Sequence, residues 1–175
     1  MPPTTSGGGS PSGGPDPNLF NWPEANPDGG NEELCKPGHY VGTYQCDLSL
    51  PGEPADASSG FVVSGPVDLM LDESQDGEFL EVSGGTLKST AMGIFVLAAT
   101  VSGKLDCLSG QFAGSLQDGT VSIPPFPSGG SFTGPMAASF SQNGPELSGK
   151  WTLIGGPQFL GESCTGPWSA TWQAN

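Results

Sequence analysis

The feature that most constrains this chain is a short pattern in which a glycine lies between two apolar residues at alternate positions. From position 39 to 50 every second residue belongs to one set, which begins with Tyr40, Gly42 and Tyr44, and the residues between are mostly polar. Such alternation predicts a β-strand with one buried face. The pattern returns as Val63-Gly65-Val67, Val82-Gly84-Thr86, Val101-Gly103-Leu105, Phe112-Gly114-Leu116, Phe132-Gly134-Met136 and Leu147-Gly149-Trp151, and with alanine as Trp168-Ala170-Trp172.

The chain after residue 34 divides into eight alternating segments, none with the periodicity of a helix. They are Cys35–Leu50, Phe61–Asp72, Phe79–Thr90, Ile94–Cys107, Gln111–Ile123, Ser131–Ser141, Glu146–Ile154 and Pro167–Gln173. Asp76-Gly77 and Asn143-Gly144 have the composition of hairpin turns. The Asp-Gly pair at 118–119 is expected to interrupt the fifth segment, and Pro124–Gly130 is expected to be a loop. Most connections are short, which favours antiparallel neighbours.

An all-β antiparallel meander of about eight strands can form a closed barrel or a two-sheet sandwich. Inward glycines among large apolar residues favour the barrel, because they permit the strong coiling that closure needs. Closure also removes exposed edge strands. A β-solenoid is disfavoured because the glycine pattern recurs at uneven intervals.

The chain has two parts of different composition. Residues 1–34 contain seven Gly and seven Pro and few apolar residues. Such a segment cannot bury enough surface to offset its ordering entropy, so it is predicted to be a disordered tether. Residues 35–175 are predicted to form one all-β domain, which is long enough for a real core.

The charge of the chain excludes some partners. The formal net charge is −14, with four lysines and no arginine. Nucleic acids and anionic membrane surfaces both require a basic face, so neither is an expected partner. No apolar run approaches the eighteen residues of a membrane-spanning helix, so no transmembrane segment is predicted.

Four cysteines are present, at 35, 46, 107 and 164. They match no zinc template, because no CxxC occurs and His39 is the only histidine. We therefore expect two disulfides and an extracytoplasmic location. An extended first strand holds Cys35 and Cys46 too far apart to pair. Two pairings remain: 35–107 with 46–164, or 35–164 with 46–107. A closed meander favours the first, because the end of its first strand lies beside the start of its last.

No catalytic group stands out. His39 falls on the polar face of its strand, without a recognisable Ser/His/Asp arrangement, and no cofactor is indicated, so the chain is predicted not to be an enzyme. No metal site is predicted either. A weak calcium candidate consists of Asp72, Ser74 and Asp76, which resemble the first half of a calcium loop. Ser83 replaces the bidentate Glu of such a loop, so a plain hairpin turn is the favoured interpretation.

Five aromatic residues could line a cavity inside the barrel. They are Tyr40, Tyr44, Trp151, Trp168 and Trp172. Barrels with such mouths bind small apolar molecules. The alternative interpretation, which is favoured, is that these side chains fill the interior.

The start Cys35-x-x-Gly-x-Tyr40, the repeated Ser-Gly-x-apolar units and the tether resemble uncharacterised secreted or lipid-anchored β-domain proteins of Gram-negative bacteria. The resemblance implies a secreted protein or an outer-membrane lipoprotein whose signal is absent from this chain, and no activity. The functional hypothesis is an extracytoplasmic, non-catalytic binding or structural module displayed on a flexible tether. The alternative is a small-ligand carrier with an aromatic-lined cavity.

Overall fold

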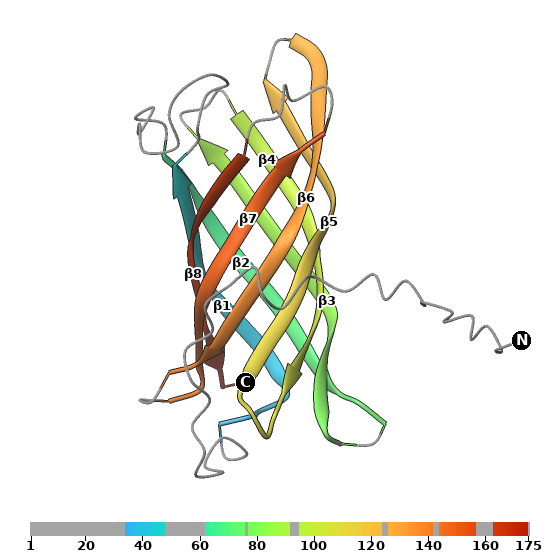
Figure 1. Ribbon diagram of the computed structural model, residues 1–175, viewed down its shortest axis with the longest axis vertical. Helices are drawn as coiled ribbons and strands as arrows, with labels where there is room; N and C mark the ends of the chain where they lie inside the picture. The colour runs from blue at the N-terminus through green and yellow to red at the C-terminus, as the bar shows by residue number, and fades with distance from the viewer. Residues whose placement is uncertain are drawn as a thin grey trace, which may run out of the picture.

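The computed structural model describes residues 34–47, 62–75, 77–91, 95–123, 126–141, 144–156 and 163–174. These residues form eight strands: β1 (Gly38–Asp47), β2 (Val62–Glu73), β3 (Phe79–Ala91), β4 (Phe95–Asp106), β5 (Gln111–Ile123), β6 (Phe126–Phe140), β7 (Glu146–Gly155) and β8 (Ser163–Gln173). Each strand is antiparallel to the next, and β8 pairs with β1 to close a barrel (Figure 1). The predicted all-β closed meander is confirmed, and the sandwich is not formed. Residues 1–33 of the predicted tether lie outside the described residues.

The prediction that Asp118-Gly119 interrupts the fifth segment is wrong, because β5 runs through it. The pairing of β5 with β6 shifts register between Leu116 and Gly119, and Asp118 has a φ of 51°. This is the geometry of a β-bulge, which places an extra residue in one strand without ending it. Aspartate tolerates this left-handed conformation better than most residues do.

Two strands begin four or more residues before their predicted starts, and β1 begins at Gly38, three residues after its predicted start at Cys35. β6 begins at Phe126, inside the expected loop Pro124–Gly130, and pairs there with the end of β5. β8 begins at Ser163, four residues before the predicted start at Pro167. Its first residues pair with the end of β7. At the starts of β6 and β8, pairing with a neighbouring strand extends the strand through Gly and Pro residues that would be expected to end it.

The inner face of the barrel is apolar. Along each strand alternate residues are buried, and together they form one hydrophobic cluster. The largest fully buried side chains are Trp151, Trp168, Tyr40, Tyr44, Phe112 and Phe132. Burial of such apolar area is the main favourable term in folding, so the aromatic residues of the glycine pattern supply much of the core.

The glycines of the pattern lie where neighbouring backbones touch. Gly42 of β1 is opposite Ala170 of β8, and a Cβ on Gly42 would lie 1.7 Å from the carbonyl oxygen of Ser169. At Gly149 of β7 the corresponding distance, to the carbonyl oxygen of Ala137, is 1.9 Å. Only glycine permits such an approach, which gives the strands the sharp coiling that a small closed barrel requires.

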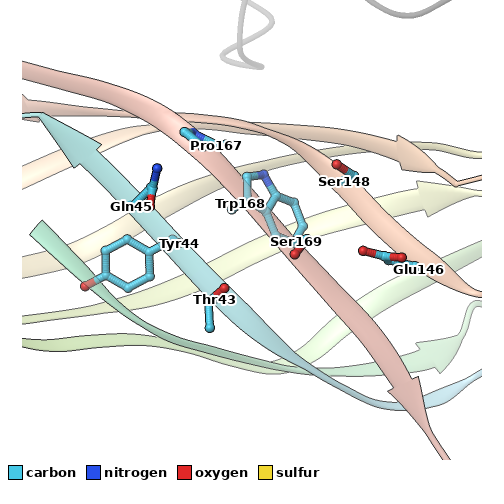
Figure 2. Close-up of a pocket in the computed structure, with 8 residues that line it drawn as sticks. All are labelled: Thr43, Tyr44, Gln45, Glu146, Ser148, Pro167, Trp168 and Ser169. Atoms are coloured by element: carbon cyan, nitrogen blue, oxygen red, sulfur yellow. The ribbon is translucent and has the colours of Figure 1, made fainter. Parts of the chain in front are cut away.

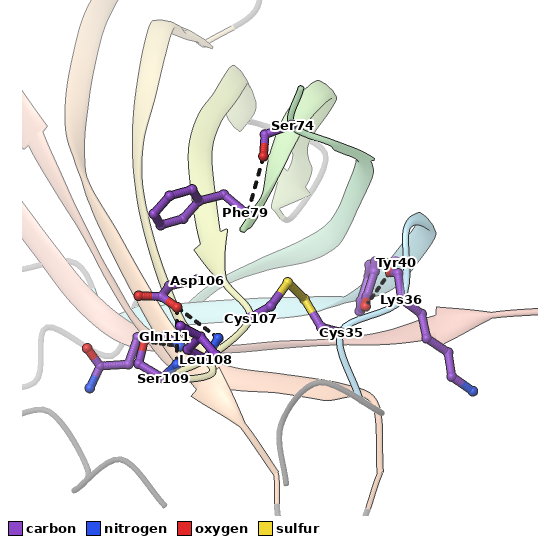
Figure 3. Close-up of a disulfide and its surroundings, with 10 residues drawn as sticks. All are labelled: Cys35, Lys36, Tyr40, Ser74, Phe79, Asp106, Cys107, Leu108, Ser109 and Gln111. Atoms are coloured by element: carbon purple, nitrogen blue, oxygen red, sulfur yellow. Dashed lines mark hydrogen bonds between the residues drawn. A yellow bond between two sulfur atoms is a disulfide. The ribbon is translucent and has the colours of Figure 1, made fainter. Parts of the chain in front are cut away.

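Two disulfides cross-link the barrel, and their pairing is the favoured one. Cys35 bonds Cys107, with Cα atoms 5.4 Å apart, and Cys46 bonds Cys164, with Cα atoms 5.7 Å apart. The first ties the residues before β1 to the turn after β4 (Figure 3). The second joins β1 to β8 just beyond the last pair of their ladder, Tyr44–Trp168.

Candidate functional site

Four of the five predicted ligand-binding aromatics are buried in the core. Tyr40, Tyr44, Trp151 and Trp168 are at most 2% exposed, whereas Trp172 is half-buried. The rings of Tyr44 and Trp151 meet edge to face, with centroids 4.9 Å apart. Such arrangements are favourable packing contacts between aromatic rings.

The polar atoms of these aromatics bond to the protein's own backbone. The Trp151 indole donates to the carbonyl of Gln45 at 3.1 Å, across the seam between β8 and β1. The Tyr40 hydroxyl donates to the carbonyl of Lys36 at 2.8 Å (Figure 3). A buried donor that already has a partner gains little from a ligand, so these atoms support a structural role.

The Trp168 indole compensates for a proline in the sheet. Pro167 of β8 pairs with Lys150 of β7 but has no N–H to donate. The indole of Trp168 donates to the Lys150 carbonyl at 3.2 Å and to the Ala137 carbonyl at 3.1 Å. It thereby reaches across Gly149, which lies directly opposite Trp168. The indole N–H thus supplies Lys150 with a donor that Pro167 cannot provide.

The hydroxyl of Tyr44 is the exception in the core. It is the one buried side-chain polar atom among the described residues without a hydrogen-bond partner of standard geometry. The hydroxyl of Ser89, which is also buried, donates its hydrogen bond to the carbonyl of Ser64 at 2.7 Å. Burial raises the pKa of Tyr44 to about 12, and the Ser89 hydroxyl offsets the rise in part. The ligand-binding role of the five aromatics stays a prediction, with Tyr44 as its strongest support.

His39 lies on the outer wall, as its position in the alternating pattern predicts. Its Nε2 is 2.8 Å from Oδ1 of Asp68 on β2, and both side chains are well exposed to solvent. Within the described residues, neither side chain makes a further hydrogen bond or ion pair. Exposed pairs of this kind contribute little to stability, and one His–Asp contact without a nucleophile defines no reaction.

The calcium candidate occupies the hairpin between β2 and β3. The Ser74 hydroxyl accepts a hydrogen bond from the Phe79 amide at 3.2 Å (Figure 3), and the Ser74 carbonyl accepts one from the Gly77 amide at 3.0 Å. Asp72 is exposed, and Asp76 lies outside the described residues. Across the described part of the chain no three His, Cys, Asp or Glu residues converge in a way that could hold a metal.

A groove of about 280 Å³ lies on the outer wall where β7, β8 and β1 meet (Figure 2). Its lining residues are Thr43, Tyr44, Gln45, Glu146, Ser148, Pro167, Trp168 and Ser169. Tyr44 and Trp168 are buried and form its floor, whereas the other six lie on the outward face of their strands. The groove is therefore a polar surface feature, separate from the apolar interior.

The groove forms beside the end of the β1–β8 ladder. Ladder pairing between these strands stops at Tyr44–Trp168, just before Pro167. Thr43, Gln45 and Ser148 are exposed beside this point, and Glu146 and Ser169 are half-buried. Within the described part of the chain, these five side chains make no hydrogen bond or ion pair. They thus present hydroxyl, amide and carboxylate groups to solvent.

This groove is not apparent from the sequence. Thr43, Gln45, Ser148 and Ser169 alternate with buried residues and look like ordinary solvent-facing positions of strands. The one available signal was Gly166-Pro167 inside an otherwise regular strand, since proline in a strand marks a gap in its ladder.

The chain matches no protein-family model, and the comparison with curated proteins finds no relative for it. Among the described residues, no helix is long and apolar enough to cross a membrane. The fold and its two disulfides define a disulfide-bonded, eight-stranded β-barrel, which is consistent with an extracellular module.

Proposed function

We propose that this chain is an extracytoplasmic, non-catalytic binding module, displayed on its N-terminal segment and engaging its partner through the outer wall of the barrel. The observation that carries the proposal is the contrast between the two faces. The inner aromatics are buried and bonded to backbone carbonyls, whereas the groove on the outer wall exposes polar groups without internal partners.

The location rests on the two disulfides, since such bonds persist in oxidising compartments. The Gly- and Pro-rich composition of residues 1–34 suits a segment that holds the barrel away from a surface. Secretion or attachment through an N-terminal lipid, as in the proteins that the sequence resembles, would place the barrel outside the cytoplasm.

A second candidate is a carrier of a small apolar ligand inside the barrel. The unpartnered Tyr44 hydroxyl favours it, because a ligand with a hydrogen-bonding group would satisfy that atom. The core aromatics oppose it, because they pack against one another.

Titration of the full chain with the neutral apolar dye Nile red separates the two candidates. A binding module with a filled core gives no saturable fluorescence increase. Saturable binding with one dye per chain, lost in a Trp151→Ala variant that still folds, would support the carrier and contradict the proposed function.

A further inference from the structure

We infer that the groove on the outer wall binds neutral polysaccharide, one or two sugar units at a time. The inference rests on the proposed function and names a ligand class for the same wall. It starts from the chemistry of six outward-facing residues: Thr43, Gln45, Glu146, Ser148, Pro167 and Ser169.

The hydroxyl groups of the groove are available to a ligand. Ser148 lies directly opposite Ser169, yet no hydrogen bond joins their side chains. Two other opposed pairs on the outer wall are bonded: Thr152 Oγ1 is 2.9 Å from Thr165 Oγ1, and the Ser102 and Ser115 hydroxyls are 3.1 Å apart. The hydroxyls of the groove can therefore bond to a ligand, whereas those of the two other pairs are bonded to each other.

The donors and acceptors suit a ligand that carries hydroxyl groups. A hydroxyl both donates and accepts, as do the hydroxyls of Thr43, Ser148 and Ser169. The Gln45 amide adds two donors and an acceptor, and the Glu146 carboxylate accepts from two neighbouring hydroxyls. The Pro167 ring offers an apolar surface between them. Sugars present this mixture of hydroxyl groups and C–H faces.

The charge around the groove favours an uncharged ligand. Glu146 is the only charged residue in the lining. Lys150 lies two positions beyond Ser148 on β7 and pairs with Pro167, so the strand carries one charge of each sign. An anionic polymer finds no complementary charge in the lining, and for a strongly cationic polymer the single Glu146 carboxylate is opposed by the nearby Lys150.

The size and shape of the groove favour a segment of a longer chain. Its volume of about 280 Å³ is just below the range of roughly 300–1,000 Å³ that encloses small molecules. Because the groove lies on the outer wall, the units on either side of the bound segment remain in solvent. Because the donors sit on rigid strands, they are held in place before the ligand binds.

The test is titration of the ¹⁵N-labelled full chain, followed by amide NMR signals, with five probes: maltoheptaose, cellohexaose, chitohexaose, an anionic oligogalacturonate and hexalysine. We expect at least one of the three neutral oligosaccharides to shift the signals of Thr43, Gln45, Ser148 and Ser169 in a saturable manner. A Gln45→Ala, Glu146→Ala double variant should weaken that binding by about tenfold or more, since it removes hydrogen bonds on both sides of the groove.

A matched control removes the same two residue types elsewhere on the outer wall. Gln117→Ala with Glu73→Ala, on β5 and β2, changes the net charge equally and should leave binding unchanged. If none of the neutral oligosaccharides shifts the groove signals, or if both double variants weaken binding alike, the inference is overturned. If only hexalysine or oligogalacturonate binds the groove, the sugar inference fails but the outer-wall function stands. The proposed outer-wall function would be contradicted by a different result, the saturable binding of Nile red inside the barrel.

Discussion

Gly42 is a residue at which the backbones of β1 and β8 lie too close for a side chain. A Cβ at this position would overlap the Ser169 carbonyl, so Gly42→Ala must push the two strands apart. We expect Gly42→Ala to destabilise the protein by about 1–3 kcal/mol or more, as overpacking does. Urea unfolding followed by tryptophan fluorescence measures the change.

Gly84 provides the matched control for this substitution. A Cβ there would meet only the Cβ of Met70, at 3.8 Å, which is ordinary contact. Gly84→Ala should therefore change stability by less than about 1 kcal/mol. If Gly42→Ala and Gly84→Ala shift the urea midpoint equally, close approach at the seam is not what requires Gly42.

Trp168 has a role that a purely apolar ring cannot fill. Trp168→Phe keeps an aromatic ring but leaves the Lys150 and Ala137 carbonyls without the indole donor. Because buried unsatisfied groups are costly, we expect a loss of about 1–3 kcal/mol. Trp172→Phe removes a more exposed bond to Pro37 and should cost less. Equal costs in thermal denaturation would contradict the compensating role of Trp168.

The two tyrosines of the chain predict how stability depends on alkaline pH. Burial raises the pKa of both Tyr40 and Tyr44 to about 12. In the unfolded chain both lose their protons near pH 10, roughly their ordinary pKa. Between about pH 10 and 12 the unfolded state therefore binds fewer protons than the folded state. The free energy of unfolding should fall as the pH rises through this range.

Absorbance at 295 nm reports tyrosinate directly. The folded protein should show almost no tyrosinate at pH 10.5, whereas the protein in concentrated urea should be more than half ionised. Equal titration curves in the two states would mean that the tyrosines are accessible to solvent and not part of a closed core.

At the scale of elements, the seam between β1 and β8 differs from the other pairings. Its ladder ends at Tyr44–Trp168, while β1 continues to pair with β2 as far as Asp47. Beyond that pair the Cys46–Cys164 disulfide joins β1 to β8, and the Trp151–Gln45 hydrogen bond joins β1 to β7. At this end of the seam, side chains take the place of ladder hydrogen bonds.

Removing the seam disulfide should open this end of the barrel. A Cys46→Ser, Cys164→Ser double variant should lose about 2–5 kcal/mol of stability, as removal of native disulfides does. Its amide hydrogen exchange should rise by about tenfold or more near Cys46, at the C-terminal end of β1. The Cys35→Ser, Cys107→Ser variant is the control: it also loses stability, but faster exchange should appear at the other end of β1. Identical exchange patterns would contradict a specific role at the seam.

The sequence predicts strands better than it predicts their ends. Alternation around Gly42, Gly114 and Gly149 is local, so the strands and their buried faces follow from residue order alone. The bulge at Asp118 and the early start of β6 at Phe126 depend on which strand lies alongside, and neighbours are known only once the barrel closes.

The same distinction applies to the candidate site. The five aromatics could be named from the sequence, but their carbonyl partners come from strands that are distant in sequence, such as Gln45 for Trp151. The groove could not be found, because it results from a local end of pairing between the first and last strands. The disulfide pairing could be predicted because closing the barrel is enough to bring Cys46 and Cys164 together.

At the scale of the whole molecule, the barrel has an apolar inner face and a polar outer face. Its interior is occupied by its own aromatic side chains, and its exposed polar groups gather on the outer wall. A partner outside the barrel can then bind without disturbing the core, as the proposed function requires. The central claim is that the inner aromatics are structural.

Hydrogen exchange of the tryptophan indole protons, followed by ¹⁵N NMR on the native full chain, tests this claim most directly. The indole protons of Trp151 and Trp168 are buried and hydrogen-bonded, so they should exchange only when the whole barrel unfolds. The half-buried Trp172 indole should exchange faster. Exchange of Trp151 or Trp168 as rapid as that of a free indole would show an interior open to solvent or ligand and would contradict the account.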